Sequence, residues 1–421
     1  MNTYAQVLTY AIPGFVVLIV IEYLASLILG KRIANSMDTI SSLSSGMTNT
    51  LKDILKLAVV IISYEWMHKQ IALFDIASTV LTYVSCFVLV DFASYWSHRL
   101  NHEINLMWNR HIIHHSSEEF NLSCALRQSI SGLLGIYFFL YVPMAIIGIE
   151  PLVVAIVAPL HLFAQFWYHT RLIDKMGPLE YIIVTPSHHR VHHAINPEYI
   201  DKNYAAIFIT WDKLFGTFKA EDPLIAPVYG VKKPVRTWNP FVINFQHLAR
   251  LAQDSMRTEH FRDKIRIWFM PTGWRPEDVS TKYPIGIIED VYTYEKYMPE
   301  VSQTLKIWSW LQLIVNNALL YYMLINIADL SVYGVILYAL FLGASVFSYT
   351  SLMDNSRWAL AGELIKVVAA FNLLILHPHW VGLSSVIPYG ATFVNVYIVS
   401  SIVFTLYYLF FDRSRSTSFA H

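Results

Sequence analysis

Long hydrophobic windows alternate with polar segments along this chain of 421 residues. A helix that crosses the hydrocarbon core of a bilayer needs about 20 mostly apolar residues, so each window predicts a transmembrane helix. The clearest windows cover residues 7–29, 76–97, 128–148, 150–169, 306–326, 331–351 and 392–411. Weaker windows cover residues 51–67 and 358–376, and Glu363 and Lys366 in the second are spaced to pair on one helix face. The pattern predicts an all-α integral membrane protein with about nine transmembrane helices.

Lysine and arginine are distributed unevenly between these windows, and cytosolic loops of membrane proteins carry an excess of both. Alternate connections carry basic residues, whereas the opposite connections carry almost none beyond Lys69. This asymmetry predicts a cytosolic C-terminus, an N-terminus on the other side and a cytosolic polar segment at residues 170–305. We expect N-terminal transmembrane helices at 1–84, a catalytic domain at 85–235, a cap extension at 236–305 and a four-helix transmembrane bundle at 306–421.

The composition supports a membrane protein and narrows its chemistry. Hydrophobic residues make up 55% of the chain and charged residues only 14%, far below the roughly 25% of an average soluble protein. The net charge is zero, which argues against a nucleic-acid partner. Only two cysteines are present, Cys86 and Cys124, which excludes a disulfide framework and any site built from cysteine alone. Glu22 and the length of the first window argue against a cleavable signal peptide.

Three short histidine motifs carry the candidate chemistry. Their patterns are HxxxH, HxxHH and HxxHH, and they contain His98 and His102, then His111, His114 and His115, and then His189, His192 and His193. Positions three and four residues apart share one face of a helix, so each motif presents its imidazoles together. Thr185 and Pro186 precede the third motif as an N-cap and a first helical residue, which predicts a helix there.

The number and type of these side chains indicate a site for two metals. Ligation by imidazole alone suits iron, zinc, copper or nickel. A structural zinc site needs four ligands, so the eight histidines of the motifs are too many for one zinc. Two redox metals that activate O2 fit the count better. Two other metal motifs are absent. The segment "HEINL" lacks the second histidine of the HExxH motif of zinc metalloproteases. A ferritin-like di-iron site needs two ExxH pairs, and Glu65 and His68 form the only one in this sequence.

The motifs and their flanks resemble the fatty acid hydroxylase/sterol desaturase superfamily of membrane di-iron enzymes. The resemblance is strongest over about residues 85–235, in "DFASYWSHRLNHEINLMWNRHIIHHSSEEFNLSCALRQS" and "GPLEYIIVTPSHHRVHHAINPEYIDKNYAAIFITWDKLFGTF". Within the superfamily, "HHSSEEFNLSCALRQS" and "IDKNYAAIFITWDKLFGTF" are most similar to the alkylglycerol monooxygenase family.

This resemblance implies a specific reaction and location. It implies a cytosolic cap with two iron ions, O2 as co-substrate and tetrahydrobiopterin as electron donor. An ether lipid lying among the membrane lipids would be hydroxylated next to its ether oxygen and would split into a fatty aldehyde and a glycerol derivative. The implied membrane is the endoplasmic reticulum in a eukaryote or the inner membrane in a bacterium.

Three further histidines receive different predictions. The superfamily commonly adds a metal ligand between the second and third motifs, so the resemblance implies that His169 is a ligand. His188 lies off the face that carries His189 and His193, and we expect it to support the ligands from outside. His161 is two helical turns before His169 and could be an ordinary core residue, so we leave it out of the site.

Two acidic residues are candidates for catalysis. Glu103 follows His102 directly and resembles an acidic residue that the alkylglycerol enzymes need, although it could also be a solvated helix charge. Replacing it with glutamine is expected to preserve iron and to remove most turnover. Asp91 shares the helix face of His98 and His102, so its carboxylate could orient a ligating imidazole.

The remaining candidates are polar residues outside the motifs. Asn121, Arg127 and Gln128 follow the second motif and could hold the pterin or the glycerol head group, or could anchor the chain at the membrane interface. Trp211 and Asp212 are more typical of a structural contact that docks the cap against the helices.

Two other functions remain open at this stage. A sterol or fatty-acyl hydroxylase or desaturase would use the same di-iron centre. A metal transporter or histidine-based sensor belongs to a different class, and it is disfavoured because transporters place their ligands near the bilayer midplane. The motifs here lie at the ends of predicted helices and in predicted cytosolic segments.

Overall fold

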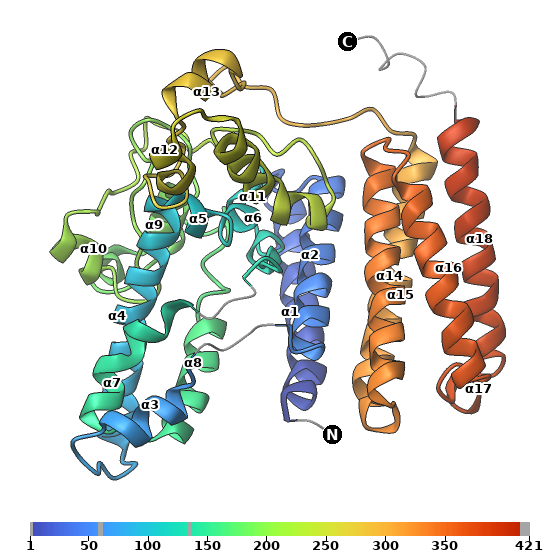
Figure 1. The fold of residues 1–421 in the computed structure, drawn as a ribbon, viewed down its shortest axis with the longest axis horizontal. Helices are drawn as coiled ribbons and strands as arrows, with labels where there is room; N and C mark the ends of the chain where they lie inside the picture. Colours follow the sequence, from blue (N-terminus) through green and yellow to red (C-terminus); the bar gives the residue numbers. More distant parts are fainter. Residues whose placement is uncertain (1–2, 58–61, 133–135, 413–421) are drawn as a thin grey trace.

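A computed structural model describes residues 3–57, 62–132 and 136–412 of the chain (Figure 1). Every regular element of these residues is a helix, apart from isolated β-bridges between Ile183 and Phe208 and between Ala194 and Tyr229. The predicted all-α class is therefore confirmed. The elements that carry the histidine motifs lie on one side, the C-terminal helices form a bundle on the other, and α1 and α2 lie between them (Figure 1).

Among the described residues, five helices are long and apolar enough to cross a membrane. They are α1 (Thr3–Ile28), α4 (Val80–Glu103), α15 (Val332–Met353), α16 (Ala359–Leu376) and α18 (Gly390–Phe410). Helix α14 (Gln303–Ile325) is also long, but Gln312, Asn316 and Asn317 lower its hydropathy. The structure thus supports an integral membrane protein with five candidate spans in its described part, and the predicted count of nine is not confirmed.

The windows at 128–148 and 150–169 do not form long helices in the described residues. The first contains the 3-10 helix η2 (Ile136–Tyr141) and the short helix α7 (Val142–Ile147), and the second contains α8 (Pro151–Phe163). Gly148 ends α7 with a φ of +90°, and a side chain there would collide with the carbonyl of Phe74. Pro151 then starts α8. These breaks explain why two transmembrane helices were wrongly predicted here, because a hydropathy window does not register turns inside an apolar stretch.

The weak window at 51–67 is also interrupted. Helix α2 (Ser36–Ile54) ends within it and α3 (Tyr64–Ile71) begins within it, while residues 58–61 lie outside the described residues. Helix α2 itself is serine-rich and was missed by hydropathy, yet most of it is buried. Its Ser44 hydroxyl lies 2.6 Å from the Tyr349 hydroxyl of α15. Small polar residues therefore pack this helix into the interior without a hydrophobic signal.

The C-terminal bundle consists of α14, α15, α16 and α18, with the short η4 (Ile327–Asp329) and α17 (Leu383–Val386) at connections. Gly362 lets α16 approach α15 closely, because a side chain at that position would lie 2.8 Å from backbone and Cβ atoms of Ser348. The predicted contact between Glu363 and Lys366 is present, with Nζ 2.6 Å from Oε2.

The histidine-bearing region is built from short helices packed around the end of α4. They are α5 (Asn105–Trp108), α6 (Ile112–His115), η1 (Cys124–Leu126), η3 (Gly177–Tyr181), α9 (Pro186–His192) and α10 (Thr210–Phe215). Above them lie α11 (Pro240–Arg257), α12 (Phe261–Arg266) and α13 (Glu277–Lys282), from which an extended segment runs to α14 (Figure 1).

Candidate metal centre

Three helices bring the histidine motifs together. The end of α4 presents His98 and His102 one turn apart, and α6 with its preceding residue presents the second motif. Helix α9 begins at Pro186 with Thr185 as its N-cap, as predicted, and it presents the third motif. The three helices surround a common space, and the imidazoles of all three motifs meet there.

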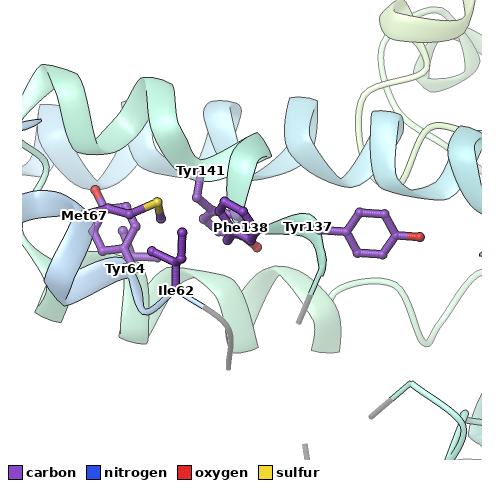
Figure 2. Close-up of a pocket in the computed structure, with 7 residues that line it drawn as sticks. Ile62, Tyr64, Met67, Tyr137, Phe138 and Tyr141 are labelled. Carbon is purple, nitrogen blue, oxygen red and sulfur yellow. The ribbon is translucent and has the colours of Figure 1, made fainter. Parts of the chain in front are cut away.

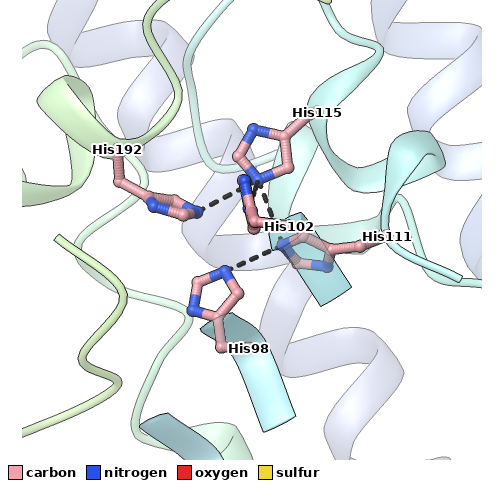
Figure 3. A group of neighbouring side chains, drawn as sticks. All are labelled: His98, His102, His111, His115 and His192. Carbon is pink, nitrogen blue, oxygen red and sulfur yellow. Dashed lines mark hydrogen bonds between the residues drawn. The ribbon is translucent and has the colours of Figure 1, made fainter. Parts of the chain in front are cut away.

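The first group of imidazoles, which we call group one, takes members from all three motifs (Figure 3). It consists of His98, His102, His111, His115 and His192. The Nε2 atoms of His98 and His111 lie 2.8 Å apart, and those of His115 and His192 lie 3.0 Å apart. The Nε2 atoms of His102 and His115 lie 3.1 Å apart. The five rings therefore aim their Nε2 atoms at one small volume.

The second group, group two, consists of His114, His169, His189 and His193. The Nε2 atom of His189 lies 2.9 Å from that of His169 and 3.0 Å from that of His193. His114 completes the group, with its Nε2 atom 3.4 Å from that of His169. In each group, the potential ligand atoms all lie within 4.8 Å of one another.

The protonation state of these rings suits metal binding. Burial, reinforced by repulsion from neighbouring imidazoles, lowers the pKa well below the usual value for His111, His114, His115, His189, His192 and His193. Burial likewise lowers the pKa of His169 to about 4, against the opposing effect of two backbone carbonyls. These seven rings are therefore neutral near pH 7, which is the form that binds a metal.

The spacing of the nitrogens also fits bound cations. Imidazole nitrogens bind a metal such as zinc at about 2.0–2.1 Å, so neighbouring ligands in one shell lie roughly 3 Å apart. The Nε2 separations of 2.8–3.4 Å in the two groups match this spacing. Neutral rings cannot all satisfy one another at this distance, because each has only one N–H donor. A cation at the centre of each group would accept the converging lone pairs.

The structure brings together all nine histidines that were proposed as ligands, including His169. Their role as ligands stays a prediction, but their division into two groups is an observation that the motifs did not reveal. The second motif is divided, because His111 and His115 belong to group one and His114 to group two. The third motif is divided in the opposite proportion, with only His192 in group one.

His188 lies outside both groups, as expected. Its Nδ1 atom lies 3.4 Å from the Thr185 backbone nitrogen, which donates to it at the start of α9. Burial lowers the pKa of His188 to about 4. The residue therefore helps to fix the beginning of the helix that carries the third motif.

The contacts of Asp91 in this structure go to residues outside the two histidine groups. Its Oδ1 atom accepts a hydrogen bond from Nε2 of His161 at 2.7 Å, and His161 belongs to neither group. The same carboxylate accepts hydrogen bonds from the backbone of Ile207 and Phe208 and from the indole of Trp211. The imidazole partner is therefore His161 and not a motif histidine, because a shared helix face does not determine which neighbouring element covers it. Asp91 instead joins α4 to α8 and to the segment before α10.

Glu103 lies at the surface end of α4, with its side chain 43% exposed. Its Oε1 atom lies 2.8 Å from Nε of Arg99, one helical turn earlier. It is not part of either imidazole group. These contacts are typical of a solvated helix charge, which was the alternative interpretation of Glu103. Its catalytic role stays a prediction.

Asn121, Arg127 and Gln128 are engaged in internal contacts. The Asn121 amide donates to the carbonyl of Ile33 and accepts from Ser123. The Gln128 amide donates to the carbonyl of Ala125. These contacts connect the chain after the second motif to its surroundings, and they lend no support to a pterin or head-group contact.

Arg127 is completely enclosed. Its Nη2 atom donates to Oδ1 of Asp38 at 2.7 Å, and its other nitrogens donate to Ser42 and Ser116. The guanidinium therefore links α2 to the second histidine motif. This is an interior anchor, and not the membrane-interface anchor that we had considered.

Trp211 and Asp212 have the structural role expected of them. The Asp212 carboxylate accepts hydrogen bonds from the backbone of Tyr204 and Ala205 and from the Thr217 hydroxyl. Trp211 donates to Asp91, as described above. Together they secure the segment after the third motif against α4.

An apolar cavity of about 260 Å³ lies between α3, η2 and α8 (Figure 2). It is lined by Ile62, Tyr64, Met67, Tyr137, Phe138, Tyr141 and Val154. Tyr137 extends from the lining and its hydroxyl donates to the Asn101 side chain, which directly precedes His102 on α4. The cavity thus has an apolar lining and one residue that reaches toward the metal centre.

Comparison with known proteins places this helical, histidine-rich membrane protein in a class. The sequence model of the fatty acid hydroxylase family matches residues 83–217, which include all nine histidines of the two groups. The chain is also 34–36% identical to alkylglycerol monooxygenases of three vertebrates over most of its length, and it belongs to the alkylglycerol monooxygenase family.

This membership rests on several relatives. The chain is 36% identical to alkylglycerol monooxygenase of Homo sapiens over 362 residues, which cover 85% of this chain and 80% of that protein. It is 35% identical to alkylglycerol monooxygenase of Xenopus tropicalis over 73% of this chain and 69% of that protein. The corresponding protein of Danio rerio is 34% identical over 81% of this chain and 75% of its own length. No solved structure matches the chain.

Proposed function

We propose that this protein is a membrane monooxygenase that cleaves the ether bond of alkylglycerol lipids. The observation that carries the proposal is the convergence of nine imidazoles into two groups, within a chain of the alkylglycerol monooxygenase family. We assign one iron ion to group one and one to group two. When bound, the two irons supply the reduction and activation of O2.

In the overall reaction, one oxygen atom of O2 is inserted into a C–H bond of the carbon next to the ether oxygen, and the other oxygen atom is reduced to water. Two electrons and two protons are consumed, and tetrahydrobiopterin is the proposed source of the electrons, by resemblance to the family. The product is a hemiacetal, whose carbon–oxygen bond breaks to give a fatty aldehyde and a glycerol derivative. The chain's own contribution is to hold the imidazoles with their Nε2 atoms converging in a largely buried space.

The apolar cavity supports a substrate with a long alkyl chain. Tyr64 and Tyr141, which line the cavity, pack against a cluster that includes Val90 of α4. Val90 precedes His102 by twelve residues, or about 18 Å along a helix. An alkyl chain in this cavity would have to extend about 18 Å along α4 to bring its ether end to the histidine groups, and the surrounding exposed apolar helices would adjoin the membrane lipids.

We further propose that the metal centre faces the cytosol, which rests on the lysine and arginine asymmetry of the connections. The membrane would then be the endoplasmic reticulum in a eukaryotic cell or the inner membrane in a bacterium. Labelling in sealed vesicles tests this orientation, because Lys232 and Lys233 should then react from the cytosolic side only. Labelling only from the opposite side would contradict it.

The reaction is tested with the purified protein in lipid nanodiscs that contain a defined alkylglycerol. Fatty aldehyde should form with O2 and tetrahydrobiopterin, should be much reduced without the pterin, and should be absent from a His115→Ala variant. Parallel incubations with a sterol and with a free fatty acid separate the related hydroxylases and desaturases. Oxidation of either of these substrates, with no aldehyde from the alkylglycerol, would overturn the proposal.

A further inference from the structure

A short segment after α9, residues 201–204, lies against the outer side of group one. The Nδ1 atom of His98 lies 2.7 Å from the backbone carbonyl oxygen of Tyr204. The Nδ1 atom of His192 lies 3.0 Å from the carbonyl oxygen of Lys202. The Nδ1 atom of His102 lies 3.4 Å from Oδ1 of Asp201. Three of the five rings therefore face an acceptor in the same four-residue segment.

This arrangement determines which nitrogen is available to a metal. A neutral imidazole carries one proton, and an acceptor beside Nδ1 keeps the proton there. The Nε2 lone pair is then directed into the centre of the group, where the Nε2 atoms converge (Figure 3). In three of the five rings, the segment thus favours the tautomer that leaves Nε2 free for a metal.

The backbone of the segment has an unusual conformation that is held by specific contacts. Asp201 and Asn203 both have a φ of +57°, and Asp and Asn tolerate this left-handed region better than most residues do. The Asn203 amide donates to the carbonyls of His188 and Lys219 and accepts from the Lys219 backbone. These contacts connect the segment to α9, so its acceptors keep their positions relative to the third motif.

Asp201 differs from the other two acceptors because it is charged. Among the acidic side chains that the structure describes, Asp201 alone lies within 4 Å of an imidazole nitrogen of the nine histidines. Its side chain is 59% exposed, whereas that of His102 is buried. Asp201 therefore occupies the solvent end of group one, where its replacement leaves no cavity in the core.

We propose that Asp201 is a positioning residue for the metal of group one. In the metal-loaded protein its carboxylate, 3.4 Å from Nδ1 of His102 in this structure, would accept the Nδ1 hydrogen, orient the ring and increase the electron density at Nε2 toward the metal. Carboxylates that support a metal-bound histidine in this way commonly contribute about 10–100-fold to metal affinity. The inference rests on the proposed metal binding by group one. It assigns to Asp201 the role that the sequence had suggested for Asp91.

The test uses Asp201→Ala, Asp201→Glu and a matched control, Glu198→Gln. Glu198 lies in the same surface region, and its carboxylate accepts from the Tyr292 hydroxyl without contacting the metal centre. Each full-length protein is depleted of metal in detergent and titrated with Co²⁺, whose visible absorption reports the ligand arrangement. The unfolding temperature of the metal-free proteins is measured in parallel.

We expect Asp201→Ala to weaken one of two Co²⁺ sites by about 10–100-fold and to change the absorption of that site only. Asp201→Glu should restore most of the affinity, and Glu198→Gln should match the unchanged protein. Equal affinity and absorption in Asp201→Ala and the control would overturn the inference. So would an equal loss in Asp201→Glu together with a lower unfolding temperature of both metal-free variants. Failure of the unchanged protein to bind Co²⁺ would instead count against the proposed metal centre itself.

Discussion

Arg127 and Asp38 form an almost completely buried ion pair, with Nη2 of the arginine 2.7 Å from Oδ1 of the aspartate. The pair joins α2 to the segment that follows the second histidine motif. The Ser117 hydroxyl also donates to Asp38, at 2.7 Å. Helix α2 thus supports the metal centre from outside, although it carries none of its histidines.

Replacing Arg127 with leucine should destabilise the protein strongly, because Asp38 would remain as an uncompensated buried charge. Removal of one partner of a buried pair commonly costs about 3–5 kcal/mol. Thermal unfolding in detergent measures the loss, and the double variant Asp38→Asn/Arg127→Leu should recover part of it. A single variant that loses less than about 1 kcal/mol would contradict this account of the pair.

Adjacent histidines of the second motif should control different metals. His114 belongs to group two and His115 to group one, so each alanine substitution should remove about one of two bound irons. The double variant should bind almost none. Iron per folded chain is measured by mass spectrometry after purification. Loss of both irons from each single variant would show that the groups do not act as separate sites.

Replacing Asp91 with alanine should lower stability while leaving the metal centre loaded. Its carboxylate accepts hydrogen bonds from four groups on three parts of the chain. Each buried donor left without a partner costs about 1–3 kcal/mol, so the total loss should exceed that of Trp211→Phe, which removes one donor. Both variants are compared by unfolding temperature and by iron content. Normal stability with lost iron in Asp91→Ala would restore the role that was first predicted for this residue.

Glu103→Gln should change the free energy of unfolding by no more than about 1 kcal/mol, because its partner Arg99 and the carboxylate itself are accessible to solvent. Its iron content should stay near normal, because Glu103 lies outside both groups. Aldehyde production then decides its role. Loss of most turnover with iron retained would support the predicted catalytic role, whereas full turnover would leave Glu103 as a surface ion-pair partner.

Asp354 should make stability depend on pH between about 4 and 6. Burial raises its pKa to about 6, against hydrogen bonds from Thr237, Trp238 and Tyr297. An unfolded aspartate titrates near 3.9. Because the folded pKa is the higher one, the protonated form favours folding below about pH 4, and this stabilisation is lost as the pH rises through 6. The difference amounts to about 3 kcal/mol at most.

Unfolding measured from pH 4 to 7 checks this expectation against Asp354→Asn. The unchanged protein should lose stability relative to the asparagine variant over this range, whatever the absolute difference between them. Parallel pH profiles for the two proteins would show that Asp354 does not titrate as its burial implies.

Much of the fold and of the candidate site was predictable from local pattern. Thr185 and Pro186 predicted the start of α9, because an N-cap and a proline at the first position act through adjacent residues only. The apolar windows near 7–29, 76–97, 331–351, 358–376 and 392–411 correspond to helices long enough to cross a membrane. The broken helices at 128–169 and the serine-rich α2 were mispredicted or missed, because average hydropathy responds neither to turns nor to buried small polar residues.

The sequence by itself predicted the nine histidines of the two groups, eight of them from motif spacing on a helix and His169 from the family resemblance. Only the tertiary structure decided that His114 and His115 belong to different groups, since neighbouring side chains on a helix diverge by about 100° and the crossing of α4, α6 and α9 decides what each one meets. The tertiary structure likewise decided which histidines Asp91 and Asp201 contact. Their partners lie 70 and 99 residues away in the sequence, at His161 and His102, and contacts across such distances follow from how helices and loops pack.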